Sequence, residues 1–120
     1  MKNIKKIQRV KRKKRIRAKI KGTFSKPRLV VFRSNAHIYA QIIDDNKKLT
    51  LVATSDLNLK KVLSKKKSTP KEIAFKVGEK IAQLASEKNI KTVVFDRNGY
   101  KFHGRTRSLA EGARSAGLVL

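Results

Sequence analysis

The sequence predicts an α/β domain, and three observations point to that class. Three short segments rich in β-branched, aliphatic and aromatic residues follow one another between residues 29 and 54. A segment with helical periodicity then leads to a nearly all-apolar run at Thr92–Asp96, and a second helical segment ends the chain. Since a right-handed crossover through a helix joins parallel strands, we expect the fourth strand to lie parallel to the first, with helices on both faces of the sheet. The length of 120 residues fits one domain.

The first three strands are expected at Leu29–Arg33, His37–Ile43 and Leu49–Thr54. Turn-forming residues separate them at 34–35 and at 44–47. In the second strand, apolar and polar side chains alternate, which predicts one buried and one open face. The fourth segment lacks this alternation, as expected of a strand that is buried on both faces.

The start of the crossover helix is marked by Thr69, Pro70 and Glu72. Thr69 fits the N-cap, Pro70 the first helical position and Glu72 the third, which completes a capping box. Asn89 is the expected stop, because Asn tolerates the left-handed backbone at which many helices end. The last helix is expected from about Arg105 to Ala116. The apolar face of the crossover helix consists of Ile73, Ala74, Val77, Ile81, Leu84 and Ala85.

Positive charge dominates the chain and is concentrated at its N-terminus. The chain has 32 Lys and Arg against 8 acidic residues, for a formal charge of +24. Residues 1–28 hold 14 of these cations and no acid. A compact protein of this charge repels itself and requires an anionic partner, of which nucleic acid comes first, before anionic membrane and acidic protein. We therefore divide the chain into a basic arm at residues 1–22 and a globular domain at residues 23–120.

The arm carries a thin apolar stripe, formed by Ile4, Ile7, Val10, Ile16 and Ile20. Like charges crowd this stripe, so it is too weak to hold a helix alone. We expect the arm to be mobile when free and to become helical when phosphates neutralise it. A solvated tail or a localisation signal is the alternative, but the number of uncompensated charges exceeds that of a short basic signal.

Several other classes of protein fit the composition poorly. The longest apolar run is Leu29–Phe32, far short of the ~20 residues that a membrane-spanning helix needs. No apolar segment follows the N-terminal charges, so no signal peptide is expected. The absence of cysteine excludes disulfides and thiolate metal sites and agrees with a reducing cytoplasm. We expect no metal, no cofactor and no small-molecule substrate.

Two segments of the domain concentrate polar side chains. Residues 28–41 place them around one hairpin, where they suit phosphates, sugar hydroxyls and unpaired bases; an ordinary hairpin with a polar solvent face is the alternative. Residues 96–105 follow a strand and open a helix, whose free N–H groups favour anions. Here the alternative is a structural loop with inward aromatic rings, closed by an ion pair between Arg105 and Asp96. The rival hypothesis from another class is a nuclease that uses Asp96, although no partner residue for that chemistry can be named.

A set of short motifs is shared with a known family. The motifs are KPRL at 26–29, FRSN at 32–35, HIYAQ at 37–41, VFDR at 94–97, GYK at 99–101, HGR at 103–105, AR at 113–114 and AGL at 116–118. In order and spacing the chain closely resembles the bacterial form of ribosomal large-subunit protein L-eighteen. Asn98 stands where the family usually has Gly, which the tolerance of Asn for a left-handed backbone permits. Phe102 stands where Tyr is common and lacks its hydroxyl group.

The resemblance implies a structural, non-catalytic protein of the large ribosomal subunit. Its fold would be a three-layer α/β/α sandwich with strand order 3-2-1-4 and a ribonuclease H-like architecture. Family members bind 5S rRNA through the basic arm and one face of the domain. They help attach that RNA to 23S rRNA in the central protuberance, next to other large-subunit proteins, so a location on cytoplasmic ribosomes is expected.

The residues expected to bind RNA fall into three groups. In the arm they are Lys2, Lys5, Lys6, Arg9, Lys11, Arg12, Lys13, Lys14, Arg15, Arg17, Lys19 and Lys21. In the hairpin they are Arg28, Arg33, Ser34, Asn35, His37, Tyr39 and Gln41, and in the loop Arg97, Tyr100, Lys101, His103, Gly104 and Arg105. Arg28, Arg33 and Arg105 are expected to bind phosphates. His37 and Tyr39 are expected to stack on bases or to contact sugars.

Overall fold

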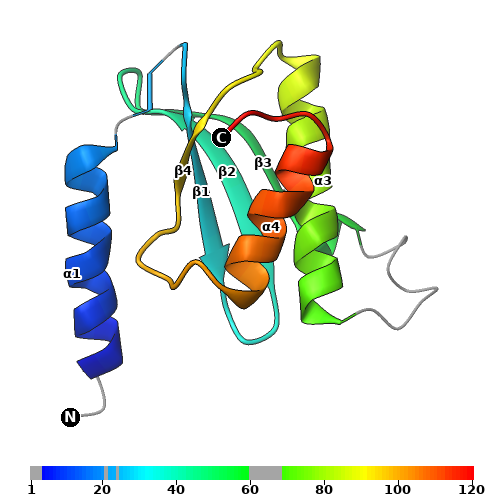
Figure 1. Ribbon diagram of the computed structural model, residues 1–120. Coiled ribbons are helices and arrows are strands. Elements are labelled where there is room, and N and C mark those ends of the chain that lie inside the picture. Colours follow the sequence, from blue (N-terminus) through cyan, green and yellow to red (C-terminus); the bar gives the residue numbers. More distant parts are fainter. Residues whose placement is uncertain (1–3, 21, 24, 60–68) are drawn as a thin grey trace.

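The computed structural model describes residues 4–20, 22–23, 25–59 and 69–120, and Figure 1 shows its helices and strands. In chain order these are α1 (Ile4–Lys19), β1 (Arg28–Arg33), β2 (Ile38–Asp44), β3 (Leu49–Ser55), the 3-10 helix η1 (Asp56–Leu59), α3 (Pro70–Glu87), β4 (Val94–Asp96) and α4 (Gly104–Ser115). The predicted strands and the two predicted helices are all present, with bounds that differ by at most two residues.

The four strands form one mixed sheet in the order β3-β2-β1-β4. β1 pairs antiparallel with β2, with Leu29 opposite Ile42, and parallel with β4, with Leu29 opposite Phe95. The α/β class, the strand order and the parallel fourth strand are therefore confirmed. β4 is shorter than expected because Thr92 leaves the sheet and makes an isolated parallel bridge with Val119 near the chain end.

One face of the sheet carries the hydrophobic core. Leu29, Val31 and Ile42 point from this face toward α3 and α4 and are completely buried. The predicted alternation in β2 is confirmed, since its even-numbered residues are buried and its odd-numbered residues are half-buried. The two helices lie close together because Gly78 and Gly112 have no side chain: a Cβ at either position would lie 2.0 Å from a carbonyl oxygen of the other helix.

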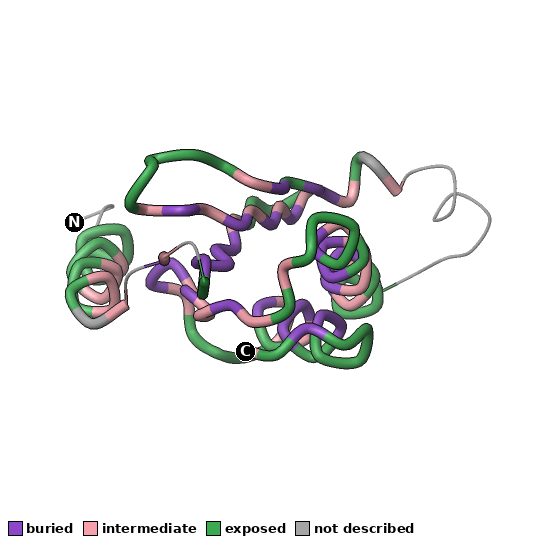
Figure 2. The backbone as a smooth tube through the Cα atoms, turned by 90° about the horizontal axis from the view of Figure 1, so that it is seen from above, coloured by how far each residue is buried: buried purple, intermediate pink, exposed green. Residues whose placement is uncertain are grey.

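The opposite face of the sheet is approached by α1. Side chains alternate along β4, so Asp96 points away from the face on which Phe95 joins the core. Arg17 of α1 reaches Asp96 on that side. Figure 2 shows α1 on one side of the sheet and the pair α3–α4 on the other. No described helix covers the β2–β3 part of this second face, where Tyr39 and Gln41 are half-buried.

Local signals at the helix ends are confirmed. The Thr69 hydroxyl accepts a hydrogen bond from the backbone N–H of Glu72 at 3.2 Å, and the Glu72 carboxylate accepts one from the N–H of Thr69 at 3.3 Å. This is the predicted capping box, with Pro70 at the first helical position. Asn89 follows the C-cap and has a φ of +61°, the left-handed backbone expected of a helix stop.

The arm differs from its expected free state. The sequence predicted a mobile segment that becomes helical only when its charge is neutralised, whereas the structure contains α1 from Ile4 to Lys19, with side-chain contacts to the domain. These contacts explain how a helix with a weak apolar stripe is held. Mobility of the arm in solution remains a prediction, and Lys2 and Lys21 lie outside the described residues.

Candidate nucleic-acid interface

The loop that follows β4 is folded around the side chain of Asp96. This carboxylate is completely buried, and its Oδ1 accepts a hydrogen bond from the backbone N–H of Asn98 at 2.8 Å. Asn98 and Gly99 then adopt left-handed backbones, with φ of +56° and +75°. Asn98 therefore fits the position at which it departs from the family, as its backbone tolerance predicted.

Two guanidinium groups occupy the other oxygen of Asp96. Oδ2 accepts hydrogen bonds from Nη1 of Arg28 at 2.7 Å and from Nε of Arg17 at 3.1 Å. Asp45 takes the rest of the Arg28 fork: its Oδ1 lies 2.9 Å from Nη2, and its Oδ2 lies 3.0 Å from Nε. These hydrogen bonds raise the pKa of Arg28 and, together with the N–H of Gly22, hold the pKa of Asp45 below its usual value. The result is a chain of alternating charges from Asp45 to Arg17.

This chain of charges changes the interpretation of two arginines. Arg28, expected to bind phosphate, is only 9% exposed and holds two carboxylates inside the protein, so the geometry gives it an internal role. Arg105 was weighed as the partner that closes the loop on Asp96, but Asp96 is paired with Arg17 and Arg28 instead. The nuclease hypothesis also requires an accessible Asp96, whereas both of its oxygens are engaged by the protein.

α1 is fixed to the loop by three arginines. Arg12 donates from Nε to the carbonyl oxygen of Gly99 at 2.9 Å, and Arg17, five residues later, donates from Nη2 to Oδ1 of Asn98 at 3.1 Å. The backbones also meet, since a Cβ on Gly99 would lie 2.4 Å from the carbonyl oxygen of Arg9. The loop is therefore the surface on which α1 rests.

The aromatic ring of Tyr100 collects two further guanidinium groups. The groups of Arg9 and Arg33 each lie 4.6 Å from the ring centroid, a favourable distance for cation–π attraction. The phenol donates a hydrogen bond to the carbonyl oxygen of Arg33 at 3.2 Å. Tyr100 thus ties the arm, the loop and the end of β1 together and orients cations that come from two of the predicted groups.

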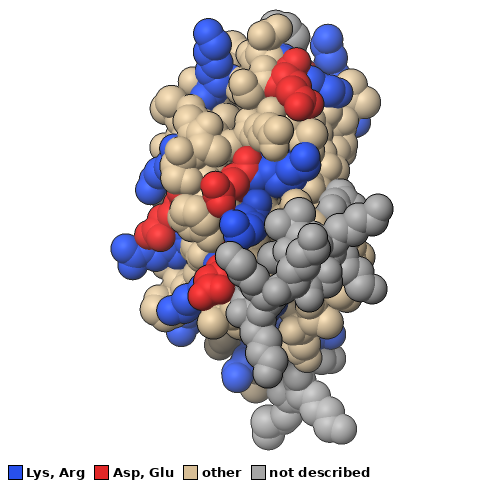
Figure 3. Space-filling view, turned by 90° about the vertical axis from the view of Figure 1, so that its right-hand side faces the viewer, with Lys and Arg blue, Asp and Glu red and all other residues tan. Residues whose placement is uncertain are grey.

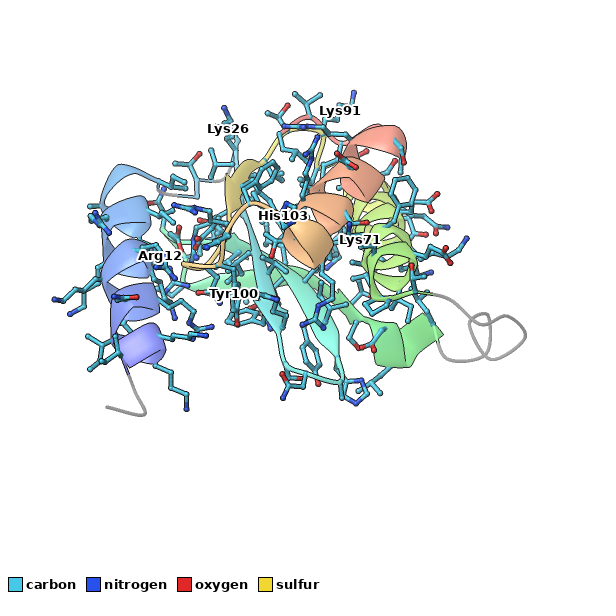
Figure 4. All side chains as sticks on the ribbon, turned by 60° about the horizontal axis from the view of Figure 1, so that its bottom comes forward. Arg12, Lys26, Lys71, Lys91, Tyr100 and His103 are labelled. Atoms are coloured by element: carbon cyan, nitrogen blue, oxygen red, sulfur yellow. The ribbon has the colours of Figure 1, made fainter. Side chains whose placement is uncertain are left out.

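A basic cleft opens between α1 and this loop, and we call it the cationic cleft. Its volume is about 530 Å³. It is lined by Lys5, Lys6, Gln8, Arg9, Arg12, Arg33, Tyr100 and Lys101. Figure 4 shows Arg12 on α1 directed toward the loop that carries Tyr100. Six of the eight lining residues are cations and none is acidic, so the cleft suits a polyanion.

Burial and neighbouring positive charges both disfavour the charged form of Lys13 on α1. Partial burial is the main cause of its lowered pKa, and the positive charges of Arg17 and Arg9 lower it further. A bound anion would relieve this repulsion.

A smaller hollow of about 250 Å³ continues along α1 between Arg12, Arg15, Ile16 and Arg97. Lys19 is the last residue of α1.

The hairpin residues divide between internal and surface roles. Ser34 closes its own turn: its hydroxyl accepts from the N–H of His37 at 3.1 Å, and its N–H donates to the carbonyl oxygen of His37 at 2.8 Å. The His37 ring lies 3.0 Å from Asp56 through Nδ1 and meets Tyr39 edge-on at 6.4 Å. These contacts favour the alternative of an ordinary structured hairpin at Ser34.

Arg105 lies beside the hairpin rather than beside Asp96. It is half-buried in the first turn of α4 and shares a notch of about 70 Å³ with Asn35, His37 and Asp56. The sequence placed Arg105 in one group and Asn35 and His37 in another, and the fold brings them together. Of the other loop residues, Lys101 and His103 are exposed, Gly104 begins α4, and Arg97 donates to the carbonyl oxygen of Tyr100 at 3.2 Å.

Acidic residues are kept away from the cationic cleft. Four of the eight are glutamates on α3 and α4. Figure 3 shows acidic and basic side chains interspersed on the side of the molecule that lies away from α1. The acids nearest α1 are neutralised, because Asp96 is buried and Asp45 is paired with Arg28. The molecule therefore presents its unbalanced positive charge on the α1 side.

The described residues contain neither a membrane-spanning helix nor a cluster of metal ligands. None of their helices has the length and apolar character required to cross a membrane. No group of three or more His, Cys, Asp or Glu side chains is gathered there in a way that could hold a metal ion.

Sequence reasoning missed three residues that shape the interface. Asp45 was explained as a turn residue, although it holds Arg28 across 17 positions of sequence. Asn98 was judged only for its backbone, although its side chain binds Arg17. Gly99 was noted as part of a shared motif, and not as the contact point of α1.

A mixed α/β fold with an acid-free cationic cleft defines a basic protein of the kind that binds polyanions. The chain belongs to the family described as ribosomal L18 of archaea, bacteria, mitochondria and chloroplasts, whose model matches residues 3–120. It is thus a structural protein of the large ribosomal subunit.

Individual relatives agree closely along their length. The large ribosomal subunit protein uL18 of Nitratidesulfovibrio vulgaris is 54% identical over 118 residues, which cover 98% of each chain. The protein of the same name from Clostridioides difficile is 55% identical and covers 95% of this chain and 93% of its own. That of Porphyromonas gingivalis is 57% identical, with coverage of 92% and 93%. The expected family is therefore confirmed.

Proposed function

We propose that this protein binds 5S rRNA through α1 and the cationic cleft and helps attach that RNA to 23S rRNA in the central protuberance. The observation that carries the proposal is the cleft itself, in which six cations from α1, β1 and the loop surround one space with no acidic residue in its lining. Ribosomal protein partners and both rRNAs follow from the family resemblance. Residues 1–22 act as the RNA-binding arm of the domain at 23–120.

The parts of the cleft have different tasks in this proposal. Lys5, Lys6 and Lys101 supply point charges for phosphates, whereas Arg33 offers a planar fork that can bind one phosphate with two hydrogen bonds. Tyr100 holds Arg9 and Arg33 in place and is a positioning residue rather than a stacking platform. Arg28 stabilises the scaffold behind the cleft and makes no phosphate contact.

Salt dependence of 5S rRNA binding tests the proposal. The slope of log Kobs against log salt concentration is negative, and removal of one cation that binds a phosphate reduces its magnitude by roughly one. Arg33→Gln and Lys101→Gln, both in the cleft lining, should each lower it by that amount. Lys76→Gln is the control, since Lys76 is exposed on α3 and lies outside the cleft. Equal slopes for all three variants and the parent would reject the cleft as the RNA-binding site.

A further inference from the structure

α1 faces the domain with arginines and faces solvent with apolar side chains, which is the reverse of an ordinary surface helix. Such a helix directs its apolar stripe toward the protein and its charges toward water. In α1 the arginines Arg9, Arg12 and Arg17 contact the domain. Apolar side chains face outward instead, with Ile4 49% exposed, Ile7 54% and Val10 44%.

The contacts with the loop fix this orientation. The backbone at Arg9 lies against Gly99, and Arg12 and Arg17 are hydrogen-bonded further along. Successive residues of a helix are rotated by about 100°, so Ile7 lies on nearly the opposite side of α1 from Arg9. A rotation that buried Ile7 and Val10 would break all of these contacts. The apolar surface is therefore left for a partner.

The charge around this surface identifies the kind of partner. Ile7 and Val10 share a groove of about 460 Å³ with Lys6, Lys11 and Lys14. Residues 4–19 contain ten Lys and Arg and no acid. The partner must therefore offer an apolar surface bordered by negative charges. The minor groove of an A-form RNA helix suits this surface, since it is wide and shallow, its riboses offer C–H surface beside their 2′-hydroxyls, and phosphates border it.

We propose that the outward face of α1, formed by Ile4, Ile7, Val10, Lys11 and Lys14, packs into the minor groove of an RNA helix. Its apolar side chains contact sugar surfaces, and its lysines bind the phosphates on either side. This inference rests on the proposed function and adds to it a second RNA-binding surface, on the side of α1 that faces away from Gly99. With both surfaces occupied, α1 lies between RNA and the domain.

The test measures the affinity of the full chain for 5S rRNA and the salt dependence of that affinity. These two quantities distinguish apolar contacts from phosphate contacts. The double variant Ile7→Ser, Val10→Ser removes the apolar surface while nearly preserving helix propensity, because Ile, Val and Ser rank close together. We expect affinity at fixed salt to fall by about tenfold, with an unchanged salt slope, because apolar contacts release no counterions. Lys11→Gln, Lys14→Gln should instead lower the slope by about two.

Leu57→Ser is the matched control, because Leu57 is 48% exposed on η1 and lies outside α1. It should leave both affinity and slope unchanged. Equal RNA affinity of the Ile7, Val10 variant and the parent would overturn the inference, including the case in which that variant loses a protein partner. A fall in affinity accompanied by a lower slope would also overturn it, since the loss would then be electrostatic. If Arg33→Gln lowers the slope in the same assay, the proposed function stands even when the inference fails.

Discussion

At the scale of single residues, Asp96 decides how the basic parts of the chain are held. Its carboxylate is completely buried. One oxygen accepts hydrogen bonds from Arg28 and Arg17, and the other accepts one from the N–H of Asn98. Buried carboxylates are costly unless they are paired and hydrogen-bonded. The pairing explains how a buried acid is accommodated behind a basic surface.

Asp96→Asn should destabilise the domain, because it leaves the guanidinium of Arg28 without one of its two carboxylate partners. Loss of one partner of a buried pair costs about 3 kcal/mol or more. The free energy of unfolding in urea measures this loss. Glu111→Gln is the control, since its pair with Arg107 is exposed and contributes at most about 0.5 kcal/mol. Equal stability of the two variants would remove Asp96 from its scaffold role.

Asp45 gives the same network a pH dependence. Hydrogen bonds from Arg28, and then the N–H of Gly22, lower the pKa of Asp45 in the folded protein. A carboxyl group with a lowered folded pKa contributes stability above its unfolded pKa of about 3.9, and this stability is lost as pH falls through the folded value. Asp45→Asn should therefore make the free energy of unfolding less dependent on pH below about pH 4. A curve parallel to that of the parent would contradict the assignment.

At the scale of elements, α1 and the 96–100 loop depend on each other. The helix has no acidic residue in its first turn and little apolar surface to bury, so its own sequence explains only part of its stability. The loop supplies hydrogen-bond acceptors at Asp96, Asn98 and Gly99 and a ring at Tyr100. Each acceptor is matched by an arginine on one side of the helix.

Gly99→Ala should release α1 from the loop. The left-handed backbone at Gly99 strains any L-residue, and the new Cβ would lie 2.4 Å from the carbonyl oxygen of Arg9. Gly104→Ala is the matched control, because its φ of +57° imposes similar strain with no atom within 4 Å of the added Cβ. Amide hydrogen exchange along residues 4–19 should accelerate in Gly99→Ala alone. Equal exchange in both variants would show that the close approach is not required for docking.

Much of the fold could be predicted at this scale because its signals are local. The alternation in β2, the capping box of Thr69 and the stop at Asn89 each depend on residues within a few positions of one another. The close crossing of α3 and α4 at Gly78 and Gly112 had no such signal, since it depends on two residues that are brought together only by folding.

The candidate site was predicted less completely than the fold, for the same physical reason. Composition identified the basic segments, but it treated their cations as equivalent. Only the fold separates Arg28, which is buried between two carboxylates, from Arg33, which lines the cationic cleft. The partners in the charge network are 17, 68 and 79 positions apart, so no local pattern indicates them.

At the scale of the whole molecule, charge and shape divide the protein into two sides. Glutamates lie on α3 and α4, and the unbalanced cations lie on α1, the loop and the end of β1. This separation leaves a mixed surface on the α3 side, which Figure 3 shows, and unbalanced positive charge around the cationic cleft on the α1 side. A field of one sign attracts a polyanion and orients the protein as it approaches.

The central claim is that the α1 side of the protein binds 5S rRNA, and a truncation tests it most directly. Removal of residues 1–20 retains Gly22, whose N–H donates to Asp45, and the core of α3, α4 and the sheet remains intact. Among the described residues, the exposed cations removed with α1 are Lys5, Lys6, Lys11, Lys14 and Arg15, and Arg9 and Arg12 of the cleft lining are removed with them.

The measurement is the salt slope of 5S rRNA binding for the truncated and full-length proteins, with circular dichroism as the check on folding. Since removal of each phosphate-binding cation reduces the magnitude of the slope by roughly one, we predict a fall of about five or more and a large loss of affinity, while the truncated domain keeps its cooperative melting transition. An unchanged slope in a folded truncated protein would contradict the account, because RNA binding would then lie elsewhere on the molecule.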